Sequence, residues 1–197
     1  IAVTKGPGLS GSLLVGVAVA KMLGALLDVP VLGVNHMEGH LYSVRLEHDV
    51  PCPFMCLVCS GGHTQIVHVV EEGQHVILGE TRDDAAGEAF DKVARFLDLG
   101  YPGGPAIDAE ALNGAPDAIR FPRALSDDPD NLDFSFSGLK TALLRRAQER
   151  GWYPLEAGFE HDPAEIAKVA AAYQAAIVDT LIDRALKAQD LHAANGI

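Results

Sequence analysis

The stretch FMCLVCSGGHTQIVHVVEEGQHVILGET, residues 54–81, decides how this chain folds. Its apolar residues fall into three strand-like runs, at 54–59, 64–71 and 75–81. The runs are separated by SGGH and by EGQ, which are short and contain glycine. Turns of this kind between apolar runs are typical of hairpins. The stretch therefore predicts a three-stranded antiparallel meander.

A different pattern precedes the meander. Residues 1–4 and 29–34 have the nearly continuous apolar character of buried parallel strands. Between them, a glycine-rich turn leads into a helix of small residues at 13–27. This order predicts a strand–helix–strand unit. Asn35 is expected to cap a second helix that runs to about Glu47.

The composition changes near Pro51, which predicts two parts, 1–50 and 51–197. After the meander, the spacing of apolar residues becomes helical. We expect helices from Asp83 to Gly100, from Ala106, from Ser137 to about Arg150, and from Pro163 with Asp162 as its cap. Strands and helices in this arrangement indicate an α/β fold.

The charge balance is acidic, because 15 Lys and Arg against 27 Asp and Glu give a net charge of −12. Such a surface repels polyphosphate, so a nucleic-acid substrate would need a partner protein that supplies positive charge. The three cysteines lie in one apolar run and indicate buried thiols in a reducing compartment, which favours a cytoplasmic location. Residues 13–27 are too short for a membrane span and include Lys21, and no signal peptide is visible.

His36 and His40 lie four residues apart in VNHMEGH, directly after a predicted buried strand. On a helix this spacing places both imidazoles on one face, where they form half of a transition-metal site. Two capping or surface histidines would show the same spacing, so that alternative stays open. A zinc protease needs Glu directly after the first His, and Met37 stands there instead.

Two glycine-rich segments have the composition of phosphate-binding loops. GPGLSG, residues 6–11, matches the dinucleotide fingerprint in form, but no acid ends the second strand, so close packing of helix on strand explains it better. In SGGHT, residues 60–64, backbone N–H groups and two hydroxyls can cradle phosphate oxygens. A bare hairpin turn remains the alternative for this second segment.

Acidic residues recur on one helical face at Asp84, Glu88 and Asp91. This stripe suits ribose hydroxyls or a phosphate-bound cation, and a solvated helix face explains it equally well. The stiff turn YPGGP, residues 101–105, contains glycines that would let a base or a ribose approach closely.

Five motifs occur in a fixed order: VNHMEGH, SGGHTQ, DDAAGEAFDKVA, YPGGP and FSFSGLKTA. In this order they resemble the tRNA N6-adenosine threonylcarbamoyltransferases, formerly called O-sialoglycoprotein endopeptidases or glycoproteases. The resemblance runs from Gly6 to the final helix. It implies an α/β fold of the actin-like ATPase (ASKHA) kind with two ribonuclease H-like lobes, in which 1–50 is part of the N-terminal lobe and 51–197 part of the C-terminal lobe.

The resemblance also implies an activity: transfer of threonylcarbamoyl from threonylcarbamoyl-AMP to N6 of adenosine 37 in tRNAs that read ANN codons. His36 and His40 match the histidine ligands of one divalent ion, expected to be Fe²⁺, with Zn²⁺ as the alternative. The residues that match the family's positions for the adenylate, or for ATP, are Val58, Cys59, Ser60, Gly61, Gly62, Asp91, Gly104 and Asp108. Cys59 departs from the family in identity, and no covalent protein nucleophile is implied.

The family's partners would be tRNA, held through a complex, and in bacteria a non-catalytic paralogue and a small ATPase; no membrane is expected. The family's third metal ligand, an Asp near the C-terminus, has no counterpart after Asp190, and its opening hairpin would precede Ile1. The chain is therefore expected to be truncated at both ends and impaired in activity. A metalloprotease and a non-catalytic ATP-binding scaffold are the alternative functions, and the histidine pair disfavours the scaffold.

Overall fold

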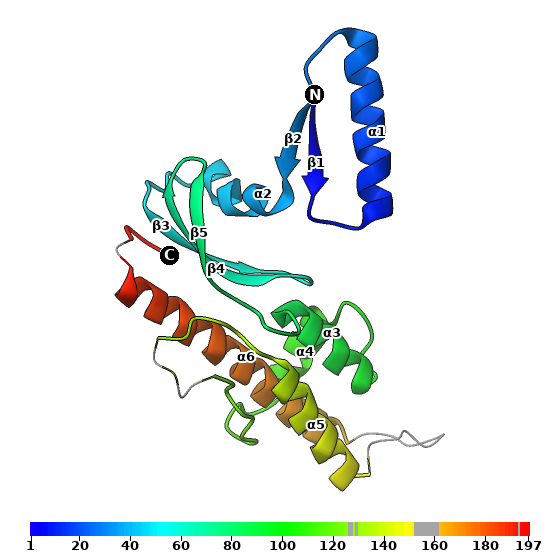
Figure 1. The fold of residues 1–197 in the computed structure, drawn as a ribbon. Coiled ribbons are helices and arrows are strands. Elements are labelled where there is room, and N and C mark those ends of the chain that lie inside the picture. Colours follow the sequence, from blue (N-terminus) through cyan, green and yellow to red (C-terminus); the bar gives the residue numbers. More distant parts are fainter. Residues whose placement is uncertain (126–127, 129, 152–161, 193) are drawn as a thin grey trace. The chain divides into compact units, whose positions relative to one another are not determined.

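The computed structural model describes residues 1–125, 128, 130–151, 162–192 and 194–197. Contacts between residues divide the chain into two compact units, Ile1–Pro51 and Cys52–Ile197 (Figure 1). Each unit has a sheet and helices of its own. The protein is therefore of the mixed α/β class.

The first unit is a parallel strand pair joined by a helix. β1 (Ala2–Gly6) pairs with β2 (Leu32–Asn35), and α1 (Ser10–Leu27) connects them and packs on β1. This pairing confirms the predicted strand–helix–strand unit. Gly24 allows the close approach of the helix, because a Cβ at this position would lie 2.4 Å from Cγ2 of Val31.

A second helix follows β2 with no intervening residue. It was expected to run to about Glu47, but α2 spans only His36–Ser43 and a single 3₁₀ turn, Val44–Leu46, completes it. The predicted cap is confirmed, since the side-chain oxygen of Asn35 accepts a hydrogen bond of 2.8 Å from the Met37 amide.

α1 is the most apolar long helix among the described residues. Within the described residues it is the one helix whose length and composition would suffice to cross a membrane, because it begins at Ser10 and not at residue 13. Core helices of soluble proteins and signal sequences have the same length and composition, so these two properties do not by themselves make α1 a membrane span. The helix also contains Lys21. Its Gly16 lies against Val3 of β1, and its Gly24 lies against Val31, the residue before β2.

The second unit is built on the predicted meander. β3 (Phe54–Cys59), β4 (Thr64–Glu71) and β5 (Gln74–Glu80) form one antiparallel sheet in the order β3-β4-β5, which confirms the meander. The end of the chain returns to β3: the Asn195 amide donates to the Pro53 carbonyl, and the Met55 amide donates to the Gly196 carbonyl, both at 2.8 Å.

Four helices complete the second unit: α3 (Ala86–Phe96), α4 (Gly103–Ala111), α5 (Ser137–Glu149) and α6 (Pro163–Leu191). The helix expected from Ala106 begins at Gly103, because Pro102 takes the cap position and Pro105 fits within a first turn. The start of α6 is as predicted, with the Asp162 carboxylate accepting from the Ala164 amide at 3.0 Å.

α6 forms the centre of the second unit's core. It packs against α4 and contacts β3 and β4 (Figure 1). Its Tyr173 is fully buried, with the rings of Phe90 and Phe121 meeting it edge-on at centroid distances of 6.2 and 5.6 Å. The buried inner face of α6 fixes α4, and through α4 it fixes α3, the helix that carries most of the candidate site.

Candidate functional site

The histidine pair occupies the first two turns of α2. His36 is the first helical residue and His40 follows one turn later, and both are exposed. Their Nε2 atoms lie 3.2 Å apart, and the ring planes meet at 68° with centroids 4.5 Å apart. The capped start of α2 therefore brings the two ring nitrogens together in the first unit.

The spacing of these nitrogens fits a shared metal ion. Two imidazoles bound tetrahedrally at 2.0–2.1 Å would place their nitrogens about 3.3 Å apart. A direct hydrogen bond between two neutral rings fits the same 3.2 Å separation. Among the residues that the structure describes, no group of three or more His, Cys, Asp or Glu side chains could hold a metal. Two imidazoles are half of a tetrahedral set of four ligands.

His36 also borders the glycine-rich turn before α1. A shallow hollow of about 430 Å³ in the first unit is lined by His36, by Thr4 of β1 and by residues of that turn and the first turns of α1, which include Pro7, Gly8 and Ser12. The sequence favours close packing of helix on strand as the explanation for the glycines of GPGLSG. The segment also forms a surface beside His36.

The SGGHT loop joins β3 to β4 as a self-supported turn. The Ser60 amide donates to the His63 carbonyl at 2.8 Å, and the Ser60 Oγ accepts from the amides of Gly62 and His63 at 3.3 and 3.0 Å. Gly61 and Gly62 are exposed with open space beside their Cα atoms. The Ser60 hydroxyl therefore shapes the loop, and the two glycines form its accessible surface.

The loop rests directly on the first turn of α3. The Gly87 amide donates to the Ser60 carbonyl at 3.2 Å, and the Ala86 amide donates to the buried Oγ1 of Thr64 at 2.8 Å. A Cβ on Gly87 would lie 2.7 Å from the Ser60 carbonyl oxygen, so only glycine allows this contact. The positive end of α3 thus lies beside the exposed glycines, where it favours an anionic ligand.

Asp91, in the middle of α3, contacts the YPGGP turn. The Asp91 carboxylate accepts from the Gly103 amide at 2.7 Å, and a Cβ on Gly103 would lie 2.5 Å from the Asp91 Cα. The next residue, Gly104, has open space beside it. Asp108 lies one turn further along α4, exposed, and accepts from the Gln174 side-chain amide at 2.8 Å. Asp91 and Gly104 are brought together, with Asp108 nearby on the same helix.

Val58 and Cys59 end the strand that leads into the loop. The Val58 side chain is buried, so this residue has only backbone atoms to offer a ligand. Burial, and secondarily the neighbouring Cys56, raises the pKa of the Cys59 thiol to about 11. The Cys59 side chain is nevertheless exposed, and Cys52 and Cys56 are only half-buried, so the predicted burial of the thiols is wrong for Cys59. The raised pKa still makes this thiol a poor nucleophile at neutral pH.

The predicted acidic stripe is not a set of free carboxylates. Lys92 binds two of its members, at 2.6 Å from the Asp84 carboxylate and 2.9 Å from that of Glu88. Asp91 points to Gly103. Hydrogen bonds from Lys92 and from the Ala85 amide lower the pKa of Glu88. A cation held by the stripe would have to displace Lys92, so the cation interpretation loses support.

Sequence reasoning missed two residues that organise the site, Gly87 and Lys92. It was wrong about the Thr64 hydroxyl, which was expected to face a phosphate but is fully buried and accepts from the Ala86 amide. Thr64 and Gly87 both lie in quoted motifs, but their importance depends on a contact between segments more than twenty residues apart.

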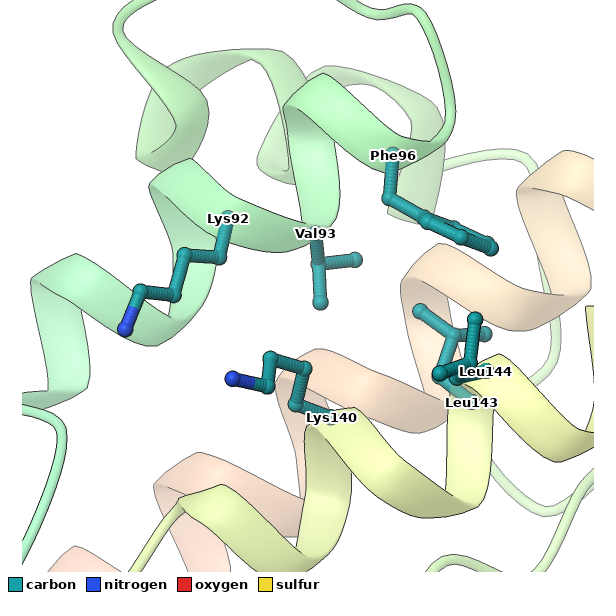
Figure 2. A pocket seen from close by; sticks show the side chains of 6 residues that line it. All are labelled: Lys92, Val93, Phe96, Lys140, Leu143 and Leu144. Atoms are coloured by element: carbon teal, nitrogen blue, oxygen red, sulfur yellow. The ribbon is translucent and has the colours of Figure 1, made fainter. Parts of the chain in front are cut away.

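Lys92 also lines a pocket of about 210 Å³ between α3 and α5, opposite Lys140. Its apolar wall is formed by Val93, Phe96, Leu143 and Leu144 (Figure 2).

These features define a class of protein before any relative is considered. It is a mixed α/β protein with two neighbouring imidazoles on one helix and, in its second unit, a glycine loop placed on a helix start, an arrangement that suits a phosphate-bearing ligand. A family model described as tRNA N6-adenosine threonylcarbamoyltransferase matches residues 1–197. The chain belongs to this family.

Relatives with this name match along nearly the whole chain. The protein from Clostridium perfringens (strain SM101 / Type A) is 52% identical over 198 residues, which cover 100% of this chain and 56% of that protein. The protein from Salinibacter ruber is 52% identical over 189 residues, 95% of this chain and 55% of that protein. The one from Clostridium kluyveri (strain ATCC 8527) is 48% identical over 198 residues. The chain thus spans little more than half the length of these curated relatives.

Proposed function

We propose that this chain is the part of a tRNA N6-adenosine threonylcarbamoyltransferase that carries two metal-ligating histidines and most of the adenylate site. The whole protein would transfer threonylcarbamoyl from threonylcarbamoyl-AMP to N6 of adenosine 37 in tRNAs that read ANN codons. The observation that supports this most is the family match over residues 1–197. The two units would then be parts of the two lobes of an actin-like fold.

His36 and His40 would hold one divalent ion with a further ligand from elsewhere in the whole protein. Imidazole suits both Fe²⁺ and Zn²⁺, and the 3.2 Å separation of the Nε2 atoms suits either. When bound, such an ion supplies Lewis acidity toward a carbonyl oxygen. The Asn35 cap fixes the first turn of α2 and so keeps both rings on one face.

The adenylate would be held by the second unit. The exposed backbone of Gly61 and Gly62, next to the start of α3, suits the phosphate. Asp91 orders the turn that presents Gly104, and a glycine with open space beside it lets a ribose or a base come close. Asp108 has one carboxylate oxygen on Gln174 and a second that can accept from a ribose hydroxyl. In this scheme Asp91 and Ser60 position the site.

tRNA would be bound with the help of partner proteins. The chain's charge of −12 repels a polyanion, so a complex has to supply positive surface. We propose a non-catalytic paralogue and a small ATPase as those partners, on the basis of the family resemblance.

The test is formation of threonylcarbamoyladenosine by the complete protein with its partners, measured by mass spectrometry of nucleosides from a tRNA transcript. His40→Ala should lower the rate by about 100-fold or more, because it removes a metal ligand. His48→Ala, an exposed histidine beyond the 3₁₀ turn, is the matched control and should keep the parent rate. A normal rate in His40→Ala would contradict the proposal.

A further inference from the structure

A pocket in the second unit lies outside every residue assigned above. Its volume is about 290 Å³, and it is formed by α6 and by the segment that follows Phe121. Three cations, two acids and two other residues line it: Arg123, Arg184, Lys187, Asp179, Asp183, Ala124 and Thr180.

Arg184 is the unusual member of this pocket. Its side chain is 1% exposed, which is rare for a charged residue unless it is fully paired. Its Nη2 donates to the carbonyl oxygens of Leu125 and Ala124. Among the residues that the structure describes, its Nε and Nη1 have no hydrogen-bond partner. A buried charged group with unpaired N–H groups is destabilising, so a ligand that satisfies them would bind favourably.

The nearest acids do not neutralise Arg184 fully. Asp183 lies 3.4 Å from Nη1 without a hydrogen bond, and Lys187 competes for the same carboxylate oxygen at 3.0 Å. Asp133 is close enough for Arg184 to help lower its pKa, but it is already bound by Arg82 at 2.8 Å and by the Glu80 amide at 3.0 Å. Within the described part of the chain, the buried guanidinium therefore has no carboxylate that is hydrogen-bonded to it.

The charges of the pocket are arranged by depth. The two acids are the more exposed, with side chains 58% (Asp179) and 51% (Asp183) accessible. The cations lie deeper, at 35% for Arg123, 27% for Lys187 and 1% for Arg184. Water screens the outer acids more than the inner cations, so the interior of the pocket is positive although the chain is strongly acidic.

Two further hydrogen bonds determine which N–H and O–H groups of the pocket can donate to a ligand. Leu125 has a left-handed backbone with φ of 58°, uncommon for a residue with a side chain, and its carbonyl is held by Arg184. Thr180 donates its hydroxyl proton to the Ala176 carbonyl at 2.8 Å, so it offers a ligand no donor.

The nitrogens of Arg184 without a partner are the first donors for a ligand. At the mouth, Arg123 is paired with Asp179. Lys187 is paired with Asp183. These two cations therefore offer a ligand only their remaining N–H groups.

We propose that this pocket is an oxyanion-binding site, in which Arg184 binds a phosphate or a carboxylate group and Lys187 and Arg123 close over it. Water could satisfy the free N–H groups but would leave the buried charge unbalanced, whereas an oxyanion meets both needs. The proposal does not depend on the transferase activity.

The test follows the side-chain Nε–H signal of Arg184 by ¹⁵N NMR in the complete protein, with the signal assigned by its loss in Arg184→Lys. Inorganic phosphate, acetate and a short RNA oligonucleotide are titrated separately, with chloride at equal ionic strength as the reference. We expect the Arg184 Nε–H chemical shift to change and saturate as phosphate or acetate is added. The anion that saturates the change at the lower concentration identifies the ligand group as a phosphate or a carboxylate. A shift at lower concentration with the oligonucleotide would name RNA phosphate as its source.

If Arg184 is needed for folding, variants of other residues test the proposal with Arg184 left in place. Lys187→Ala should weaken binding about tenfold, as expected for one charge-assisted hydrogen bond. Lys140→Ala, a lysine that lines the other pocket on α5, should bind like the parent protein. The proposal fails if chloride shifts the Arg184 signal as much as phosphate and acetate do, or if Lys187→Ala binds like the parent.

Discussion

Asp83 shows how one carboxylate joins two motifs that lie far apart in the sequence. It accepts from the hydroxyls of Ser135 and Ser137 at 2.6 and 2.7 Å, and from the amides of Phe136 and Ser137 at 2.8 and 3.2 Å. Partial burial alone would raise its pKa, but these hydrogen bonds outweigh burial and lower it. Asp83 therefore anchors the start of α5 beside the segment that leads into α3.

Asp83→Asn should reduce the free energy of unfolding at pH 7 by about 1 kcal/mol, a modest loss because water screens this exposed carboxylate. Because the folded state lowers the pKa of Asp83, its contribution is present above about pH 4 and is lost as the pH falls through the lowered value. Urea unfolding should show a larger difference in unfolding free energy between parent and variant at pH 7 than at pH 3. An equal difference at both pH values, or none at pH 7, would contradict this role; the exposed Asp117→Asn is the control.

At the scale of elements, α3 connects the parts of the candidate adenylate site. Its first turn carries the SGGHT loop through Ala86 and Gly87, and Asp91 in its later part holds the start of α4. The geometry depends on glycines placed where two backbones touch. The loop, the helix start and the YPGGP turn are thus one arrangement within the second unit.

Gly87→Ala should push the loop away from α3, because the new Cβ would meet the Ser60 carbonyl oxygen at 2.7 Å. We expect the dissociation constant for a non-hydrolysable adenylate analogue to rise about tenfold, since small displacements of a binding loop are costly. Isothermal titration calorimetry measures this change. Gly138→Ala, in the first turn of α5 with open space around it, is the control. Unchanged affinity in Gly87→Ala would show that the loop does not bind the adenylate.

The sequence predicted elements better than it predicted the contacts between them. The three strands of the meander and the starts of α2, α5 and α6 follow from local signals: alternation, turns and caps. The sequence predicts the start of α4 three residues late, because the composition of YPGGP is typical of a turn whereas its last three residues are helical. The ion pairs of Lys92 with Asp84 and Glu88 could not be predicted from the sequence, because the same spacing of charged residues occurs on a helix face that is simply exposed to water. The roles assigned to the site residues remain predictions.

At the scale of the whole chain, the sequence divides between Pro51 and Cys52 into two compact units. The residues just before this division are exposed, with Leu46 87% accessible and Glu47, His48 and Asp49 exposed as well. An exposed connection between compact units is the preferred site of proteolysis.

Brief digestion with a glutamate-specific protease should therefore cut after Glu47 before it cuts within the helices. Mass spectrometry of the products should show a fragment that begins at His48 and persists, because the second unit has its own buried core. Glu47→Gln should remove this early cut. Rapid loss of the second unit together with the first would contradict the division into independently compact units.

The claim that a divalent ion is held by imidazoles of α2 is tested most directly by metal analysis. Complete protein purified in parallel as parent, His36→Ala and His48→Ala is measured by inductively coupled plasma mass spectrometry. The account predicts about one iron or zinc ion per chain in the parent and in His48→Ala, and a large loss in His36→Ala. Equal metal content in all three proteins would contradict it.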